Sequence, residues 1–493
     1  MELSACIIAK DEENNLPRLL KSLKGKFDEI ILVDTGSIDR TIEVAREYGC
    51  KVYEKEWTGF ANARNFAVSK ATGDWVWHFD ADFEIDDEEF KKAKQHLLIL
   101  DDRFNSVEVI IENYNIDGTV RAYSSHTFIH RNKPDIKWVG KVHEWIQNGE
   151  LVFALNVKVK HFGFEDYEVL KGKAKRNIKL LEEEIKDLKR RGEDNSQVAY
   201  KYFYLVQSYA VLSGDNKEYT ERVVKTVRNY FSLRPNSDRK NIFDIHIFTY
   251  LMEALLFLKK YDECKEYLEK ALDLNPDYPD FLFYKGKLFE KIGKHSAAFK
   301  GYVEFLFCVD KLHMKSPFES YNGLTVLSEK MVRSYNIALE IVPELFDKLE
   351  NKAESISFVE RKWKESRGLY TGIAYGKLLD KKGENPEKIL RKLSRIYDKN
   401  YVAQFEYGKF LLMKNRIVEA QRFLKKVMEL NPEFSMGKVL FLYAGVLSGK
   451  IDVATFVKVT AELKKKLEKI KHPYFSTLLS KCVETLNKVQ NSG

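Results

Sequence analysis

The sequence predicts two parts: an α/β domain with a mostly parallel sheet, followed by an all-α domain of helical repeats. Within the first 80 residues, apolar runs of strand type alternate with stretches of helical periodicity. From about Tyr167 the pattern becomes helical and stays so. The 493 residues also exceed one compact domain, because domains usually hold roughly 100 to 200 residues.

Four extended runs and three helices are expected in the α/β domain. Pro17 is tolerated in the first turn of the first helix, Asp39 can cap the second, and Gly49 stands where glycine commonly follows a helix. Helical connections between successive strands favour parallel pairing and helices on both faces of the sheet. The expected strands are 3–9, 29–34, 51–57 and 75–80, and the expected helices are 14–23, 40–48 and 60–71.

Two acidic motifs end strands of this sheet. The second strand ends at Asp34, and the fourth ends in FDAD, which contains Asp80 and Asp82. In parallel α/β sheets, ligands bind outside the carboxyl ends of the strands. We therefore expect the two motifs to meet at one edge.

The helical part carries signs of a repeat. Two helices end in LNP, at Pro276 and Pro432, as a tetratricopeptide repeat does, and Gly408, Ala420 and Pro432 keep the 8, 20 and 32 spacing of that repeat. Residues 311–365 do not fit the period. We therefore expect an irregular repeat domain in which some repeats are degenerate.

The domain boundaries follow from these patterns. The α/β domain is expected at 1–165, or at 1–195 if the long charged helix that begins near Tyr167 belongs to it. The helical domain is expected at 196–493, with a split near 311–365.

Cysteine usage and hydropathy indicate a cytoplasmic protein, or one that lies at the inner membrane surface. The five cysteines are odd in number, far apart and without a CxxC pair, which fits reduced thiols. No run of about 18 apolar residues predicts a membrane span. The N-terminal MELSACIIAKDEE has no basic segment, so it indicates a core strand and not a signal peptide.

The two parts differ in charge. Residues 1–165 hold 22 Lys+Arg against 29 Asp+Glu, a net −7, whereas the remainder carries a net +15. Solvated helix faces or a docking surface for an anionic partner would both account for the positive excess. No nucleic-acid module is recognisable, so no nucleic-acid partner is expected. The sequence also lacks GxGxxG, Walker and GxSxG motifs.

The DAD tripeptide is the clearest candidate for metal chemistry. Carboxylates at i and i+2 of an extended backbone point the same way, so Asp80 and Asp82 can share a divalent cation. Hard oxygen ligands suit Mg²⁺ or Mn²⁺, and an open coordination sphere could bind a diphosphate. A solvated turn is the alternative interpretation.

These residues stand in segments that carry a family resemblance. IIAKDEENNLPRLLKSL, DEIILVDTGSIDRT and ARNFAVSKATGDWVWHFDAD, in this order, resemble a family 2 glycosyltransferase with the GT-A nucleotide-sugar fold. GKVHEW (140–145) and VKHFGF (159–164) resemble the branch that contains lipopolysaccharide-core glucosyltransferases and sublancin-type peptide S-glycosyltransferases. Members of this branch often carry a helical or tetratricopeptide C-terminal region.

The resemblance implies roles for individual residues. The nucleotide-sugar site would contain Ala9, Glu12, Asp34, Arg64 and Asp80, and the metal site would contain Asp80, Asp82 and His161. Asp11 departs from the family pattern, which usually has Asn there. His161, just past a strand, could also be a structural histidine.

The base that takes the acceptor proton is assigned to Glu144 of the VHE segment. His143 beside it would orient the base or contact phosphate. A charge at a strand end is the alternative interpretation of Glu144.

Together these features predict a metal-dependent, inverting glycosyltransferase that uses a nucleotide-diphosphate sugar, above all a UDP-sugar, with Mn²⁺ or Mg²⁺. The acceptor would be a peptide, a lipid-linked saccharide or another saccharide. The repeats would recruit the acceptor or a protein partner, or mediate self-association. The alternative is a tetratricopeptide scaffold with a catalytically silent nucleotide-sugar-binding domain. The intact acidic and basic residues of the motifs argue against this alternative.

Overall fold

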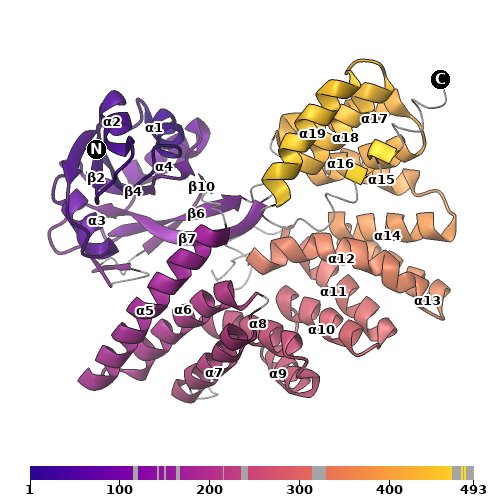
Figure 1. Cartoon of the computed structure of the whole chain (residues 1–493), viewed down its shortest axis with the longest axis horizontal. Helices are drawn as coiled ribbons and strands as arrows, with labels where there is room; N and C mark the ends of the chain where they lie inside the picture. The colour runs from indigo at the N-terminus through magenta and orange to yellow at the C-terminus, as the bar shows by residue number, and fades with distance from the viewer. Residues whose placement is uncertain are drawn as a thin grey trace.

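An α/β part comes first in the chain, and a long run of helices follows it in an arc (Figure 1). This arrangement confirms the predicted fold class. The computed structural model describes residues 1–114, 120–140, 144–148, 152–162, 167–214, 216–234, 242–313, 329–432, 434–468, 479–480 and 482–484.

One eight-stranded sheet and one separate hairpin hold the strands of the α/β part. The sheet consists of β1 (Leu3–Ala9), β2 (Glu29–Asp34), β3 (Lys51–Glu54), β4 (Trp75–Asp80), β5 (Phe83–Glu84), β6 (Ser106–Tyr114), β7 (Val120–Arg131) and β10 (Val152–His161). The hairpin pairs β8 (Lys137–Val139) with β9 (Trp145–Gln147) in antiparallel register.

The first four strands form the parallel half that the sequence predicts. The strand order is β3-β2-β1-β4-β7-β6-β10-β5, and β1 pairs in parallel with both β2 and β4. In this register Ala9 lies opposite Asp34, and Ile8 lies opposite Asp80. The two acidic motifs therefore end at the same edge of the sheet, as expected.

The second half of the sheet extends beyond the predicted strands. β7 runs antiparallel to both β4 and β6, and β6 pairs in parallel with β10. The short β5 pairs with the end of β10, which places His161 opposite Phe83. This last pairing brings a residue from the far end of the sheet next to the DAD motif.

Helices cover both faces of the sheet. They are α1 (Leu16–Leu23), α2 (Thr41–Glu47), α3 (Phe60–Val68) and α4 (Asp87–Ile99). Alternate residues of a strand point to opposite faces. Accordingly Ile7 packs in a core with α1 and α4, while Cys6 packs in a second core with α3.

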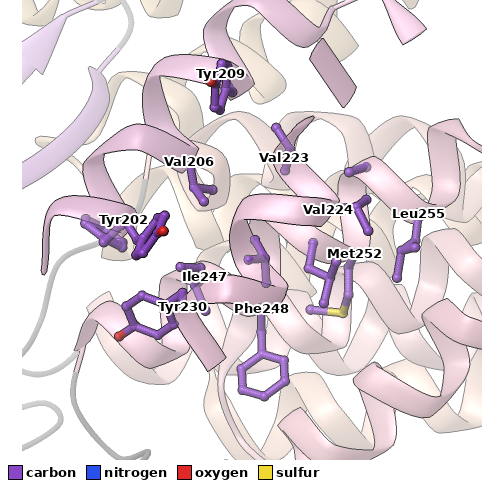
Figure 2. Close-up of a cluster of buried hydrophobic side chains, with 14 of the residues drawn as sticks. Tyr202, Val206, Tyr209, Val223, Val224, Tyr230, Ile247, Phe248, Met252 and Leu255 are labelled. Atoms are coloured by element: carbon purple, nitrogen blue, oxygen red, sulfur yellow. The ribbon is translucent and has the colours of Figure 1, made fainter. Parts of the chain in front are cut away.

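The remaining helices pack as successive pairs around continuous apolar cores. They are α5 (Tyr167–Arg191), α6 (Asn195–Ser213), α7 (Lys217–Leu233), α8 (Ile242–Phe257), α9 (Tyr261–Leu274), α10 (Pro279–Lys291), α11 (His295–His313), α12 (Glu329–Asp347), α13 (Lys352–Ser366), α14 (Leu369–Lys382), α15 (Glu387–Ile396), α16 (Tyr401–Met413), α17 (Ile417–Leu430), α18 (Ser435–Leu447) and α19 (Val453–Glu468). Figure 2 shows the core between α6, α7 and α8, where Tyr202 and Val206 of α6 lie among apolar side chains such as Phe248 of α8.

Small residues of the repeat signature lie where paired helices approach closely. A Cβ atom added at Gly408 of α16 would lie 3.1 Å from the side chain of Leu424 of α17. Ala420 is fully buried, and Pro432 follows the end of α17. These positions keep their spacing because larger side chains would separate the helices.

Helices α12 and α13 pack against helices that are not their neighbours in the chain. α12 contacts α11, α14 and α10, and it also contacts β7 of the α/β part. The helical region thus touches the sheet through a helix far along the chain. The predicted boundaries at 165, 195 and 196 stay predictions, although α5 occupies most of the interval between the first two. Within the described ranges, no helix has both the length and the apolar character needed to cross a membrane.

The α10–α11 contact gives a stability test. A Cβ atom at Gly301 would lie 2.8 Å from the backbone nitrogen of Gly286, so Gly301→Ala should lower the free energy of unfolding by about 1 to 3 kcal/mol and lower the melting temperature. Gly172→Ala is the matched control, because that exposed position of α5 has no atom within 4 Å of the added Cβ. This control should raise helix stability by about 0.5 to 1 kcal/mol. Equal melting temperatures for the two variants would contradict the close helix approach.

Candidate active site

Asp34 shapes the turn that follows β2. It is only 2% exposed, and its Oδ2 accepts hydrogen bonds from the backbone amides of Gly36 (2.9 Å) and Ser37 (3.0 Å). The Ser37 hydroxyl donates to Oδ1. Gly36 has φ +105°, a conformation that favours glycine. The carboxylate therefore fixes a loop beside Ala9, at the edge where the parallel strands end.

The loop after β1 is tied to the same turn. The Asp11 amide donates to Ser37 Oγ (2.9 Å), and Asp11 Oδ1 accepts from the Ile38 amide (2.8 Å). The Glu12 amide donates to Thr41 Oγ1 (2.7 Å). An Asn at position 11 could offer the same oxygen, so the departure from the family pattern preserves this link.

A buried arginine joins two carboxylates of the predicted site, Asp80 and Glu144. Arg64 of α3 is 4% exposed; its Nη2 donates to Asp80 Oδ1 and its Nε donates to Glu144 Oε1, each at 2.9 Å. Its guanidinium also lies over the rings of Phe128 (5.6 Å) and Trp138 (5.0 Å). One planar cation therefore sets the relative position of β4 and of the segment that enters β9.

The electrostatics of Arg64 follow from this arrangement. Burial works against its charged form, but the charges of Asp80 and Glu144 and their hydrogen bonds raise the pKa of the guanidinium above its usual value. Its third nitrogen, Nη1, is buried and has no hydrogen-bond partner within the described ranges. A buried cationic donor of this kind is suited to an anionic ligand such as a phosphate oxygen.

Asp82 lies beside His161. The two side chains approach to 3.3 Å between Oδ2 and Nε2, and His161 Nδ1 lies 2.6 Å from Asn113 Oδ1. An amide oxygen can only accept, so Nδ1 carries a proton and Nε2 faces Asp82 with a lone pair or a second proton. Burial raises the pKa of Asp82, but the hydrogen bond and charge of His161 outweigh burial and lower it.

The donor set at Asp82 fits a divalent cation. Asp82 Oδ1 is buried without a hydrogen-bond partner within the described ranges, and an imidazole lone pair beside a carboxylate is a common ligand pair. Asp80, however, is turned toward Arg64. Among the described residues, no three His, Cys, Asp or Glu side chains converge closely enough to hold a metal ion. The structure thus brings Asp82 and His161 together but leaves Asp80 outside that pair.

The hairpin that carries Glu144 is held by a residue that the sequence analysis missed. Asn65 Nδ2 donates to the Trp138 carbonyl (2.8 Å), and the Trp138 amide donates to Asn65 Oδ1 (2.9 Å). The Trp138 indole also donates to His78 Nε2 (3.0 Å). Asn65 follows Arg64 in the ARN segment, so consecutive residues of α3 hold the hairpin and the candidate base. His143, the other predicted catalytic residue, lies outside the described residues.

Comparison with known proteins adds an independent line of evidence. The sequence profile described as "Glycosyl transferase family 2" matches residues 4–148. A TPR repeat-containing protein of Synechococcus elongatus is 35% identical over 151 residues, which cover 30% of this chain and 36% of that protein. The SPbeta prophage-derived glycosyltransferase SunS of Bacillus subtilis is 28% identical over 282 residues, which cover 55% of this chain and 62% of that protein. An uncharacterized glycosyltransferase of Rickettsia conorii is 34% identical over 131 residues, covering 27% of this chain and 42% of that protein.

The chain thus spans between about a third and two thirds of the length of these relatives. The profile match covers the strands from β1 to β9, and it includes the two acidic motifs, Arg64, Asn65 and Glu144. Most of the candidate active site therefore falls inside the matched segment, while His161 lies just beyond it. Residues 4–148 are thus similar in sequence to glycosyl transferase family 2.

Proposed function

We propose that the protein transfers a sugar from a nucleotide-diphosphate sugar, above all a UDP-sugar, to a hydroxyl or thiol acceptor with inversion at the anomeric carbon. The observation that carries this proposal is the Arg64 bridge. It places the Asp80 carboxylate of the donor-side motif and the Glu144 carboxylate within 2.9 Å of one buried guanidinium. An inverting transfer needs a donor site and a base set at a fixed distance from each other.

Donor binding is assigned to the edge where the parallel strands end. Ala9 and Asp34 face each other there in register, and Glu12 lies in the loop tied to the Asp34 turn. Arg64 Nη1 is assigned to an oxygen of the diphosphate, because a buried N–H donor without an acceptor within the described ranges would gain a hydrogen bond there.

A divalent cation, Mn²⁺ or Mg²⁺, is assigned to Asp82 and His161, with Asp80 as the third ligand. When bound, such a cation neutralises charge on the diphosphate leaving group. Asp82 would contribute the buried oxygen that now has no partner within the described ranges. His161 would contribute Nε2, since Asn113 keeps the proton on Nδ1.

Glu144 is assigned as the base. The acceptor oxygen or sulfur forms a bond to the anomeric carbon while the bond from that carbon to the diphosphate oxygen breaks, and the diphosphate leaves with the bonding electron pair. The acceptor proton passes to Glu144. Because Oε1 accepts from Arg64, we assign the proton to Oε2. The hydrogen bond from Arg64 holds the carboxylate in one orientation, which a base requires.

The helical region is assigned to acceptor recruitment or to a protein partner, including a second copy of the chain. Stacked helix pairs form extended surfaces suited to such roles. A scaffold with a silent donor site is the second candidate. The buried Arg64 bridge speaks against it, because a chain that had lost catalysis would have little reason to keep a buried cation between two carboxylates.

A panel of UDP-, GDP- and dTDP-sugars with Mn²⁺ tests the proposal. Binding is measured by thermal shift, and slow transfer to water is measured by release of the nucleoside diphosphate. One nucleotide class should raise the melting temperature and be hydrolysed slowly. Binding without any turnover would favour the silent scaffold, and no binding would contradict both candidates.

The cation assignment predicts a specific loss in Asp82→Asn. The variant keeps the shape of the side chain, so its melting temperature without metal should stay close to that of the wild type. The Mn²⁺-induced thermal shift and donor hydrolysis should both be lost. Asp135→Asn, at an exposed position, is the control. Full activity in EDTA, or an unchanged Mn²⁺ shift in Asp82→Asn, would refute the assignment.

The base assignment predicts a different pattern for Glu144→Gln. Glutamine keeps shape and one hydrogen-bond acceptor for Arg64 but cannot take a proton at neutral pH. Donor affinity should stay within about threefold, while turnover falls by roughly 10² to 10⁴. Glu88→Gln, at an exposed position of α4, should leave both unchanged. A Gln variant that turns over at the wild-type rate would mean that the base lies elsewhere.

Asn65 is expected to position the base through the hairpin. Asn65→Ala removes both hydrogen bonds to the Trp138 backbone, so amide hydrogen exchange in β8 and β9 should accelerate. Turnover should fall by about tenfold, with donor affinity retained. Asn62→Ala on the exposed side of the same helix, where Asn62 bonds only Thr58 in the described set, should change neither. Unchanged amide hydrogen exchange in Asn65→Ala would mean that Asn65 does not hold the hairpin in place.

A further inference from the structure

Helix α6 of the helical region lies next to the candidate base. Trp145 follows Glu144 directly, and its ring meets that of Tyr200 edge to face, with centroids 6.3 Å apart. Glu144 turns toward Arg64, whereas Trp145 turns toward α6. Trp145 is nevertheless 47% exposed, which is unusual for a tryptophan packed between two parts of a protein. These two consecutive residues therefore mark a border at which an aromatic surface stays accessible.

Two tyrosines of α6 extend this surface. Tyr200 and Tyr204 are four residues apart, so they share one face of the helix, and their hydroxyl oxygens lie 3.1 Å apart. Both are partly exposed. Tyr202 and Val206 lie on the opposite face, within the core of Figure 2. The tyrosine pair therefore lies on the face that is turned toward the hairpin, where Tyr204 also packs against the edge of the helical core.

The pair also lies within the electrostatic reach of Glu144. Burial raises the pKa of Tyr200, and the Glu144 carboxylate raises it further. For Tyr204, burial, the neighbouring Tyr200 and the Glu144 carboxylate all raise the pKa. Both phenols are thus neutral hydroxyl groups beside a carboxylate.

A buried ion pair lies beside these aromatic side chains. Lys201 is 3% exposed and its ammonium lies 3.0 Å from a carboxylate oxygen of Glu184 on α5. The same ammonium lies 5.5 Å from the Trp145 ring and 5.6 Å from the Tyr200 ring. Because Glu184 balances its charge, Lys201 serves to hold the aromatic rings in place and is poorly placed to attract an anion.

We propose that Trp145, Tyr200 and Tyr204 form an acceptor subsite and that the acceptor is a saccharide. The inference rests on the proposed function, since the base role of Glu144 is what requires the acceptor hydroxyl to lie here. A pyranose ring presents a C–H face and an edge of hydroxyl groups, which match an exposed indole and a pair of phenol hydroxyls. A phosphate or carboxylate at this position would face the negative charge of Glu144. The transfer itself is the one written above, with a sugar hydroxyl as the attacking group and Glu144 as the proton acceptor.

The test compares acceptor-dependent with water-dependent turnover in the full-length protein. The donor is the nucleotide sugar that the panel identifies, and the probes are methyl glucoside, methyl galactoside, methyl mannoside and their disaccharides, with serine and cysteine peptides as the comparison. Release of nucleoside diphosphate is measured with and without each probe. At least one glycoside should accelerate release above the rate in water, and the product should be an oligosaccharide by mass spectrometry.

The variants then locate the subsite. Trp145→Ala and the double variant Tyr200→Phe/Tyr204→Phe should each lower glycoside-dependent turnover, relative to hydrolysis, by about tenfold. The double variant removes only hydroxyl groups and keeps the rings, so it separates lost contacts from lost folding. Tyr209→Phe is the matched control on the same helix, because the Tyr209 ring packs in the helical core and its hydroxyl bonds Glu182 of α5. Its ratio and its hydrolysis rate should equal those of the wild type.

The outcomes are distinct. If only a peptide, or no probe at all, accelerates release of the nucleoside diphosphate, the saccharide assignment is wrong. If the ratio of glycoside-dependent turnover to hydrolysis is unchanged in both Trp145→Ala and Tyr200→Phe/Tyr204→Phe, these residues do not form the subsite. A wild-type protein that hydrolyses no donor would instead refute the proposed function.

Discussion

The buried guanidinium of Arg64 is the constraint on which the rest of the site depends. A cation at 4% exposure is stable only if its partners are held close, because removing one partner leaves a buried charge uncompensated. Those partners come from separate elements: Asp80 ends β4, and Glu144 precedes β9. Trp138 and Phe128 complete the surroundings with ring faces. The fold must therefore bring α3, the main sheet and the hairpin to one point before the ion pairs can form.

The parallel half of the sheet and its two acidic motifs could be predicted because their signals are local. Strand periodicity, glycines that end helices and carboxylates after apolar runs can each be recognised within a few residues. Helical connections between the strands then imply parallel pairing, which determines which strand ends meet. The placement of Asp34, Ala9 and Asp80 at one edge follows from that rule. The repeat signature was readable for a similar reason, since small residues recur wherever paired helices touch.

The features that were not predicted depend on pairings across long stretches of chain. The family resemblance placed His161 in one site with Asp82, but the pairing of the two-residue β5 with β10 that brings the two together could not be predicted, because so short a strand has no detectable periodicity. The orientation of Asp80 toward Arg64 could not be foreseen from the DAD spacing, which suggested that both carboxylates share one partner. Asn65 stood in a recognised segment, yet its role needs the position of Trp138, 73 residues later. The contact between Trp145 and Tyr200 of α6 joins the two predicted domains. Sequence patterns within either domain could not predict it.

The separation of the β8–β9 hairpin from the main sheet has an evolutionary consequence. The sheet edge to which we assign the donor is built from strands that share one hydrogen-bonded ladder, so a change in any of them is transmitted to its neighbours. Among the described residues, β8 and β9 pair with each other, and the side chain of Asn65 bonds the backbone of Trp138. Mutations in the hairpin, or in the helix face beside it, can accumulate without altering the register of the ladder. Under the proposed function, a lineage could in this way exchange its acceptors while inheriting an unchanged site for the donor.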